Sequence, residues 1–172
     1  MIPLVRQSLG LLSGLAFVAC IAIYGASFVG LTLDGLHLWP FAITLGIFAL
    51  MIPMCVIEYE SMAQRTFFWK GFADDKPNWV VPTIKGLGIL YLIHFILFLA
   101  LSHAASPDIV NGQFVLDDHG TIKRMLTERE YLRLKGDELR LFATGWISFY
   151  SVTTAYWRFP SKLPLPQAGL KP

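Results

Sequence analysis

The feature that most constrains this chain is an uncharged apolar run of about 25 residues, from Leu9 to Leu33. A second such run extends from about Leu38 to Ile57, and a third, from about Pro82 to Leu101, contains only Lys85 near its beginning. A helix of about 20 apolar residues crosses the hydrocarbon core of a bilayer, which is about 30 Å thick. Each of these runs therefore predicts one transmembrane helix.

The composition of the whole chain fits a membrane protein. Of its 172 residues, 55% are hydrophobic and 15% are charged, whereas soluble domains contain about 45–50% apolar and about 25% charged residues. The formal net charge of +2 is too small to indicate a nucleic-acid-binding surface. We therefore expect the lipid bilayer as a partner and no nucleic acid.

The first apolar run also has features of a secretory signal peptide. Arg6 supplies a basic residue ahead of it, and the segment from Phe17 to Cys20 loosely matches a lipoprotein cleavage box. The residues after Cys20 stay apolar, where a mature lipoprotein would become polar, and this favours a membrane anchor. Asp34 and Gly35 predict a turn, so that the first two spans form an antiparallel hairpin.

A fourth span is predicted from Leu141 to Phe159, although it is the most polar of the four. Seven of its residues carry hydroxyl groups: Thr144, Ser148, Tyr150, Ser151, Thr153, Thr154 and Tyr156. Thr144, Ser148, Ser151 and Ala155 follow one another at steps of four and three residues, which places them on one face of a helix. We expect this small, polar face to contact other helices rather than lipid, so that the fourth span lies inside the bundle.

Residues 102–140 form a predicted extramembrane insert between the third and fourth spans. Asn111-Gly112 between apolar residues indicates a β-hairpin, and Asp118-His119-Gly120 indicates a second turn, giving two or three short strands. Thr127 and Glu130 match a capping box at the start of a helix. Because no proline follows until Pro160, we expect one continuous helix that joins a stalk to the fourth span.

The predicted fold class is thus an all-α integral membrane protein: a four-helix transmembrane bundle with a small extramembrane β-hairpin and a helical stalk. One bundle domain covers 1–159, with spans at about 9–33, 38–57, 82–101 and 141–159, and 160–172 is a Pro-rich extended tail. An inside amino terminus places eight of the 14 Lys and Arg residues in the cytoplasm, against six for the opposite topology. We therefore expect both termini in the cytoplasm, with the chain in a bacterial inner membrane.

Small residues recur along the first span. Gly10 and Gly14 form a GxxxG motif, and Ala22, Ala26 and Gly30 continue the spacing at multiples of four. Small side chains on one face allow a neighbouring helix to approach closely. The neighbour is either another span of the same chain or a second copy, and we favour the second copy.

His94 lies near the middle of the third span, where an ionisable side chain is a candidate functional group. The alternative is a neutral imidazole that is hydrogen-bonded to a hydroxyl of the fourth span. Haem ligation would require a second histidine at matching depth, and His37, His103 and His119 lie at a span end or outside the spans. Glu58 and Glu60 are two residues apart and point to different sides of a helix. We therefore expect no cofactor and no metal.

Three functional hypotheses remain. The first is a small non-catalytic membrane protein that acts through helix packing, as a homo-oligomer or as an accessory subunit of a membrane complex. The second is a small channel or transporter with a path lined by Thr144, Ser148 and Ser151 and with His94 as a proton-sensitive element. The third is a membrane enzyme that acts on lipid or quinone through His94, Glu58 and Glu60. The chain contains no HExxH, CxxC, GxSxG or phosphate-binding glycine loop, so we assign no catalytic residue and favour the first hypothesis.

Overall fold

The computed structural model of this chain is mostly helical and describes residues 3–30, 32, 38–64, 76–102 and 105–159. The helices are α1 (Pro3–Ala26), the short 3₁₀ turn η1 (Ser27–Val29), α2 (Leu38–Gln64), α4 (Val80–Ser102) and α5 (Glu128–Arg158). The strands are β1 (Ser106–Val110), β2 (Gln113–Asp118) and β3 (Thr121–Met125). The predicted tail, 160–172, lies outside the described residues.

The three apolar runs form three helices that are long and apolar enough to cross a membrane. These are Leu4–Val29, Leu38–Val56 and Val80–Ser102, and α2 continues through Pro53 to Gln64. Large apolar side chains on all three, such as Leu12, Phe48 and Ile96, are exposed on the outside of the fold. An outer surface of this kind matches a hydrocarbon solvent, because a soluble protein rarely exposes apolar patches of such extent.

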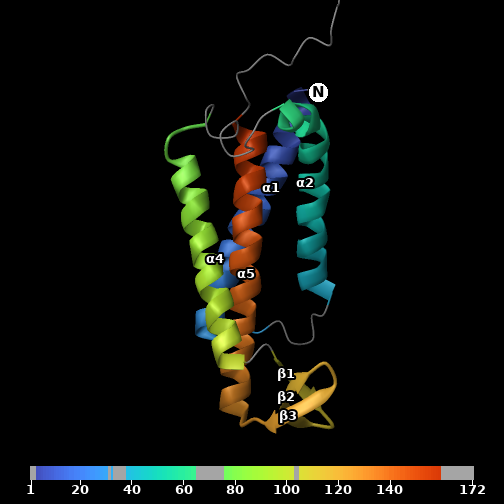
Figure 1. Cartoon of the computed structure of the whole chain (residues 1–172), viewed down its shortest axis with the longest axis vertical. Coiled ribbons are helices and arrows are strands. Elements are labelled where there is room, and N and C mark those ends of the chain that lie inside the picture. The colour runs from blue at the N-terminus through green and yellow to red at the C-terminus, as the bar shows by residue number, and fades with distance from the viewer. Residues whose placement is uncertain (1–2, 31, 33–37, 65–75, 103–104, 160–172) are drawn as a thin grey trace, which may run out of the picture.

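α5 is the central helix of the fold, and α1, α2 and α4 each pack against it (Figure 1). Its composition differs from that of its neighbours, and among the described residues it does not qualify as an apolar membrane-length helix. Much of its second half is nevertheless covered by the other three helices: Ala143 and Thr153 are fully buried, and Trp146 is 4% exposed. The buried hydroxyl-bearing residues of this half, Thr144, Ser151 and Thr153, therefore face protein.

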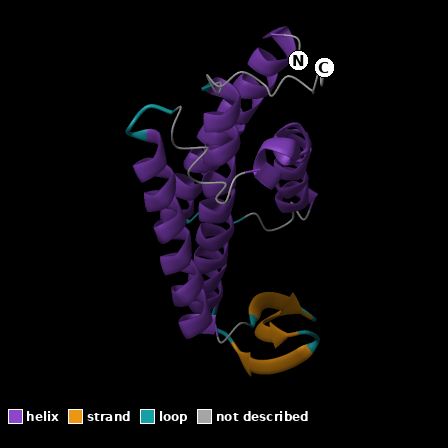
Figure 2. Cartoon of the chain, turned by 45° about the horizontal axis from the view of Figure 1, so that its top comes forward, coloured by secondary structure: helices purple, strands orange, loops and turns teal. Residues whose placement is uncertain are grey.

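The predicted hairpin is part of a three-stranded antiparallel sheet with the strand order β1-β2-β3. Asn111 and Gly112 adopt φ values of 51° and 77° in the first turn, and His119 and Gly120 adopt 53° and 88° in the second. These left-handed conformations suit the tight turns of hairpins, in which Asn and Gly are favoured. The sheet lies at the end of the bundle away from the beginning of α1 (Figure 2).

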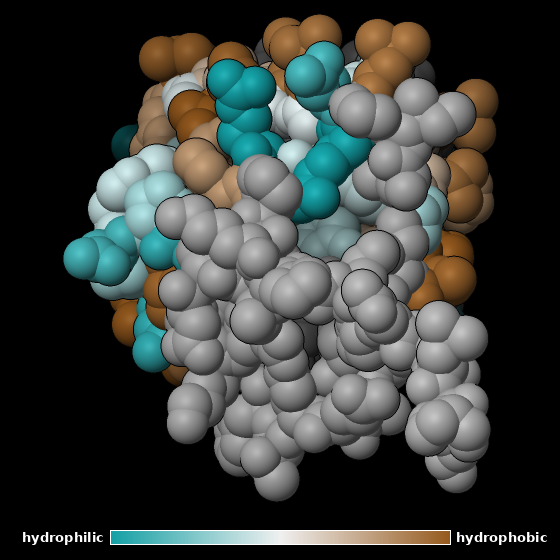
Figure 3. Space-filling model, turned by 90° about the horizontal axis from the view of Figure 1, so that it is seen from above, coloured by the Kyte–Doolittle hydropathy of each residue, from teal (hydrophilic) through white to brown (hydrophobic). Residues whose placement is uncertain are grey.

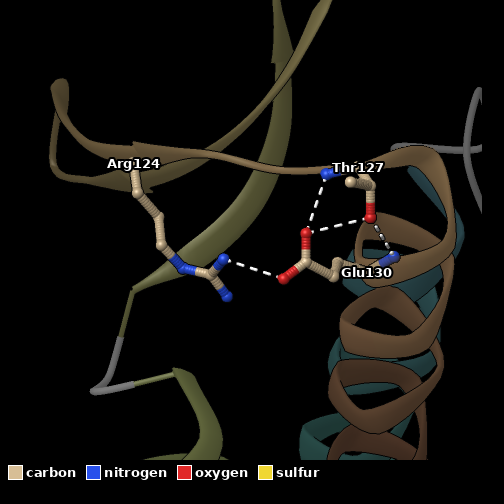
Figure 4. A network of polar contacts seen from close by, with 3 residues as sticks. All are labelled: Arg124, Thr127 and Glu130. Atoms are coloured by element: carbon tan, nitrogen blue, oxygen red, sulfur yellow. Dashed lines mark hydrogen bonds and ion pairs between the residues drawn. The ribbon is translucent and has the colours of Figure 1, made fainter.

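The sheet is fastened to the first turns of α5. Leu116 and Leu126 pack with Tyr131 and Leu134 in a small buried cluster. The predicted capping box is confirmed: the Glu130 backbone N–H donates to Thr127 Oγ1, and the Thr127 N–H donates to the Glu130 carboxylate (Figure 4). This cap satisfies backbone donors that a helix start otherwise leaves without partners.

Candidate functional site

The most enclosed polar contact of the bundle joins α1 to α5. Ser13 Oγ lies 2.7 Å from Thr153 Oγ1 and 2.9 Å from Thr154 Oγ1. Ser13 and Thr153 are both fully buried. Hydroxyls that pair across two helices avoid the cost of an unsatisfied polar group in an apolar environment. This cluster is therefore a polar lock between the two helices.

Three of the sequence-predicted polar residues precede this cluster in α5. Thr144, Ser148 and Ser151 donate to the carbonyls of Arg140, Thr144 and Ser148, over 2.8, 2.8 and 2.6 Å. Ser148 Oγ also lies 3.1 Å from the carbonyl oxygen of Leu87 in α4. All three hydroxyl groups thus have hydrogen-bond partners within the protein, which favours a packing role for them.

α2 is held by two aromatic side chains of α5. The Tyr150 hydroxyl donates to the Ile43 carbonyl over 2.8 Å, and Trp146 Nε1 donates to Thr44 Oγ1 over 3.1 Å. The close approach of the helices occurs at Gly46, where a Cβ atom would lie 2.6 Å from Tyr150 Oη. Sequence reasoning missed this contact and Ser13 as well. The available signals were Ser13 and Thr44, hydroxyl groups inside apolar runs, because such groups often form polar contacts between membrane helices.

The structure separates the five small residues that the sequence pattern grouped. Gly10 faces the backbone of Trp157, to which an added Cβ would approach within 3.5 Å, and Gly14 faces Thr154 at 3.9 Å. Ala22 is exposed and Ala26 is half-buried. Gly30 ends η1 with a φ of 88° and has nothing within 4 Å of an added Cβ. The GxxxG motif therefore meets α5 of the same chain.

His94 is half-buried on α4 and pairs with α1. Its Nδ1 atom lies 3.0 Å from the Leu90 carbonyl oxygen, so Nδ1 is the donor, and Nε2 lies 3.4 Å from the Tyr24 hydroxyl. The two rings are 5.6 Å apart in an edge-to-face arrangement. Sequence reasoning sought this hydroxyl on the fourth span, whereas the structure places it on α1.

Cationic side chains lie at both ends of the buried part of α5. Arg6 donates to the carbonyl oxygens of Trp157 and Tyr156 over 3.2 and 3.1 Å, and the Lys76 ammonium donates to the Phe159 carbonyl. Positive charge is favourable here because the last carbonyls of a helix carry partial negative charge. These contacts fix the end of α5 to α1 and to the residues just before α4.

Arg140 lies at the other end of the buried part of α5. It donates to the Ser27 carbonyl over 3.2 Å and to Asp137 Oδ1 over 2.6 Å, and it lies over the Phe28 ring at 5.0 Å. Asp137 Oδ2 is buried and has no hydrogen-bond partner among the residues that the structure describes. Arg140 thus joins α5 to η1 at the level where α1 ends.

The described residues include no group of three His, Cys, Asp or Glu side chains arranged to hold a metal ion. His37 and His103 lie outside the described residues, as do the side chains of Glu58 and Glu60. The site is therefore a set of interhelical polar contacts. Comparison of the chain with models of known protein families, with curated proteins and with solved structures finds no match.

Proposed function

We propose that this chain is a four-span integral membrane protein that acts without catalysis, through helix packing, as a homo-oligomer or an accessory subunit of a membrane complex. The spans are α1, α2, α4 and the second half of α5. The observation that carries the proposal is the packing of the polar helix α5 against three helices whose outer faces are apolar. Such an arrangement is stable in hydrocarbon, where polar groups must find partners inside the protein.

The dimensions of the fold support a fourth crossing. Arg6 contacts Trp157 and Arg140 contacts Ser27, so α1 runs beside α5 over this whole distance. The stretch of α5 from Arg140 to Trp157 is about 26 Å long at about 1.5 Å per residue. This length is close to the hydrocarbon thickness of about 30 Å. α5 therefore crosses the bilayer within the bundle, and its first turns extend beyond it.

The bonding of the α5 hydroxyls favours the packing hypothesis over a channel. Thr144, Ser148 and Ser151 all donate to helix carbonyls, and Ser13 closes the contact between α1 and α5. A conducting path needs polar groups that are available to a permeating ion or to water. The hydroxyl groups here act as interhelical and intrahelical partners instead.

The surface that we assign to association is the outward face of α5. Phe142 and Phe149 are 49% and 47% exposed in a helix whose other large residues in this stretch are buried. They are seven residues apart and therefore share one helix face. α4 and α2 lie on the two sides of α5 (Figure 1), and the exposure of Phe142 and Phe149 shows that the described residues leave their face uncovered. Since α5 already covers Gly10 and Gly14, an association surface lies elsewhere than on the GxxxG motif.

The proposed orientation has both ends of the described fold in the cytoplasm and the sheet on the opposite side. α1 begins and α5 ends at the same end of the bundle (Figure 1). Seen from that end, brown apolar side chains stand around much of the margin of the bundle (Figure 3). In this orientation eight of the 14 Lys and Arg residues lie on the cytoplasmic side and six on the other, as the positive-inside rule favours.

Topology is tested with reporters fused to both termini and with a thiol probe on His119→Cys in the β2–β3 turn. We expect the two termini on one side and the His119→Cys probe on the other. Termini on opposite sides of the membrane would contradict an even number of crossings. Tyr91→Cys, inside α4, is the control: a thiol within a spanning helix is expected to be protected from an impermeant reagent.

Association is tested by the mass of the detergent-solubilised particle. We expect a particle larger than one chain, and we expect its mass to fall in Phe142→Ala/Phe149→Ala. The matched control is Phe41→Ala, which removes an exposed phenyl ring from α2. A wild-type particle with one chain and no other subunit would contradict the proposal.

A further inference from the structure

A lateral groove lies between α1, α4 and α5 near the end of α5. Its volume is about 140 Å³, and its walls include Phe17 of α1, Ile84 of α4 and Ala155 of α5. Thr83 of α4 contributes to the wall on the outside, where it is exposed. In the proposed membrane orientation this groove opens toward the acyl chains of the bilayer, so its apolar lining suits a hydrocarbon chain.

The polar groups of the groove are already occupied. Thr154 bonds to Ser13, Ser151 donates to the Ser148 carbonyl, and Thr83 Oγ1 donates to the Trp79 carbonyl over 2.8 Å. The lining therefore offers an occupant apolar contact rather than hydrogen bonds. This favours an aliphatic chain over a polar small molecule as the occupant of the groove itself.

One end of the groove is aromatic and cationic. The rings of Trp79 and Phe159 line it and meet edge to face at 5.9 Å. Lys76 donates to the Phe159 carbonyl, and the neighbouring Arg158 is exposed. Aromatic and basic residues are enriched at the level of lipid headgroups. Arg6, which binds the carbonyls of the preceding residues, adds a third positive charge at this end.

The acidic side chains that the structure describes all lie at one end of the fold, together with the basic residues of the same segments. Its acidic side chains belong to the sheet and to the part of α5 before Arg140: Asp108, Asp117, Asp118, Glu128, Glu130, Asp137 and Glu138. Arg6, Lys76 and Arg158 lie at the other end, where Phe159, whose carbonyl accepts from Lys76, lines the groove. Arg158 has no hydrogen bond or ion pair within the described residues, so its guanidinium is available to an anion.

We propose that this groove is a binding site for an anionic phospholipid, with one acyl chain between α1, α4 and α5 and the phosphate against Arg158. The positive charges of Arg158 and Arg6 favour a negatively charged headgroup over a zwitterionic one. The aromatic pair of Trp79 and Phe159 lies where the chain meets the headgroup. This inference rests on the proposed membrane insertion and adds a specific lipid ligand to it.

The test uses the full chain in phosphatidylcholine vesicles with spin-labelled phosphatidylglycerol or spin-labelled phosphatidylcholine as the probe. Electron paramagnetic resonance measures the fraction of each probe that the protein immobilises. We expect preferential immobilisation of phosphatidylglycerol. Arg158→Gln lowers that preference about fivefold, as expected for the loss of one interfacial cation. Arg133→Gln, which removes an exposed arginine from the stalk, leaves the preference unchanged.

A second variant tests the site by filling the groove. Thr83→Trp places an indole ring in the groove from its exposed wall, and it lowers the immobilised fraction of phosphatidylglycerol. The matched control is Ile89→Trp, because Ile89 is 60% exposed on α4 and does not line the groove. Equal effects of the two tryptophans would overturn the site, as would equal immobilisation of the two lipids by the wild-type chain.

Alkaline carbonate extraction of the same vesicles separates this inference from the proposed function. A chain that remains inserted but shows no preference for phosphatidylglycerol overturns the lipid site alone. A chain that carbonate extracts overturns membrane insertion and the lipid site together. Retention of the chain, combined with the expected preference and the effects of Arg158→Gln and Thr83→Trp, supports both.

Discussion

Gly46 of α2 approaches Tyr150 of α5 so closely that a methyl group on Gly46 would lie 2.6 Å from the tyrosine oxygen. The same hydroxyl donates to the Ile43 carbonyl one turn earlier in α2. The absent side chain and the buried hydroxyl therefore form one contact, in which a small residue allows an interhelical hydrogen bond. Together with the hydrogen bond from Trp146 to Thr44, this contact attaches α2 to the central helix.

We predict that Gly46→Ala destabilises the fold, because the added methyl group must displace Tyr150 or the backbone of α2. The expected cost is about 1–3 kcal/mol, as for overpacking in a core. Combining it with Tyr150→Phe removes the oxygen that clashes, so the double variant is less destabilised than the sum of the single variants. Thermal unfolding in detergent measures the four proteins, and strictly additive effects would contradict the contact.

The hydroxyl lock between α1 and α5 gives a second prediction. Ser13→Ala leaves Thr153 and Thr154 without their partner in α1 and is expected to cost about 0.6–1.7 kcal/mol. Ser8→Ala makes the same chemical change at an exposed position of α1 and is expected to have no measurable effect. The midpoint of chemical unfolding in detergent distinguishes the two variants. Equal midpoints would show that the lock contributes nothing to stability.

A third prediction concerns the glycines of α1. Gly10 faces the Trp157 backbone, whereas Gly25 has nothing within 4 Å of an added Cβ. Gly10→Leu therefore forces α1 away from α5 and lowers the thermal stability of the monomer, while Gly25→Leu does not. If Gly10→Leu instead changed only the mass of the solubilised particle, the motif would serve contacts between chains and its placement against α5 would be wrong.

The cap of α5 predicts a local dependence on pH. Hydrogen bonds from the Thr127 backbone, the Arg124 guanidinium and the Thr127 hydroxyl lower the pKa of Glu130 from 4.5 to about 2. A carboxylate with a lowered pKa stabilises the folded state above its unfolded pKa, and this contribution is lost as the pH falls from about 4.5 through about 2. The first turn of α5 should therefore fray over this interval.

Amide hydrogen exchange in the residues after Thr127 measures this fraying. In Glu130→Gln the protection at neutral pH is already reduced, because the neutral amide is a weaker acceptor for Arg124. Glu128→Gln removes an equal charge from the first turn, and Glu128 makes no capping bond in the structure. Equal loss of protection in both variants would assign the effect to charge alone rather than to the cap.

The sequence by itself determined the elements whose causes are local. Apolar runs of membrane-spanning length became α1, α2 and α4, because length and apolarity decide whether a helix can be solvated by hydrocarbon. Asn111-Gly112 became a hairpin turn, and the Thr127–Glu130 box became the start of α5. In these cases each signal lies within a few residues of the structure that it specifies.

The sequence also indicated correctly that Thr144, Ser148 and Ser151 belong to one continuous helix that starts at the capping box. It did not indicate which residues their hydroxyl groups contact. Periodicity shows which residues share a face and carries no information about the element that covers that face. For the same reason the pattern of small residues did not distinguish a neighbour in the same chain from a second copy.

Only the tertiary structure decided which surfaces meet. It placed Ser13 on Thr153, Gly10 on the Trp157 backbone, and the Tyr24 hydroxyl beside His94. These pairs are separated by 70 or more positions in the chain, so their contact depends on how three helices arrange around a fourth. The physical reason is that a helix fixes the direction of its own side chains, whereas the partner of each side chain is selected by packing of the whole bundle.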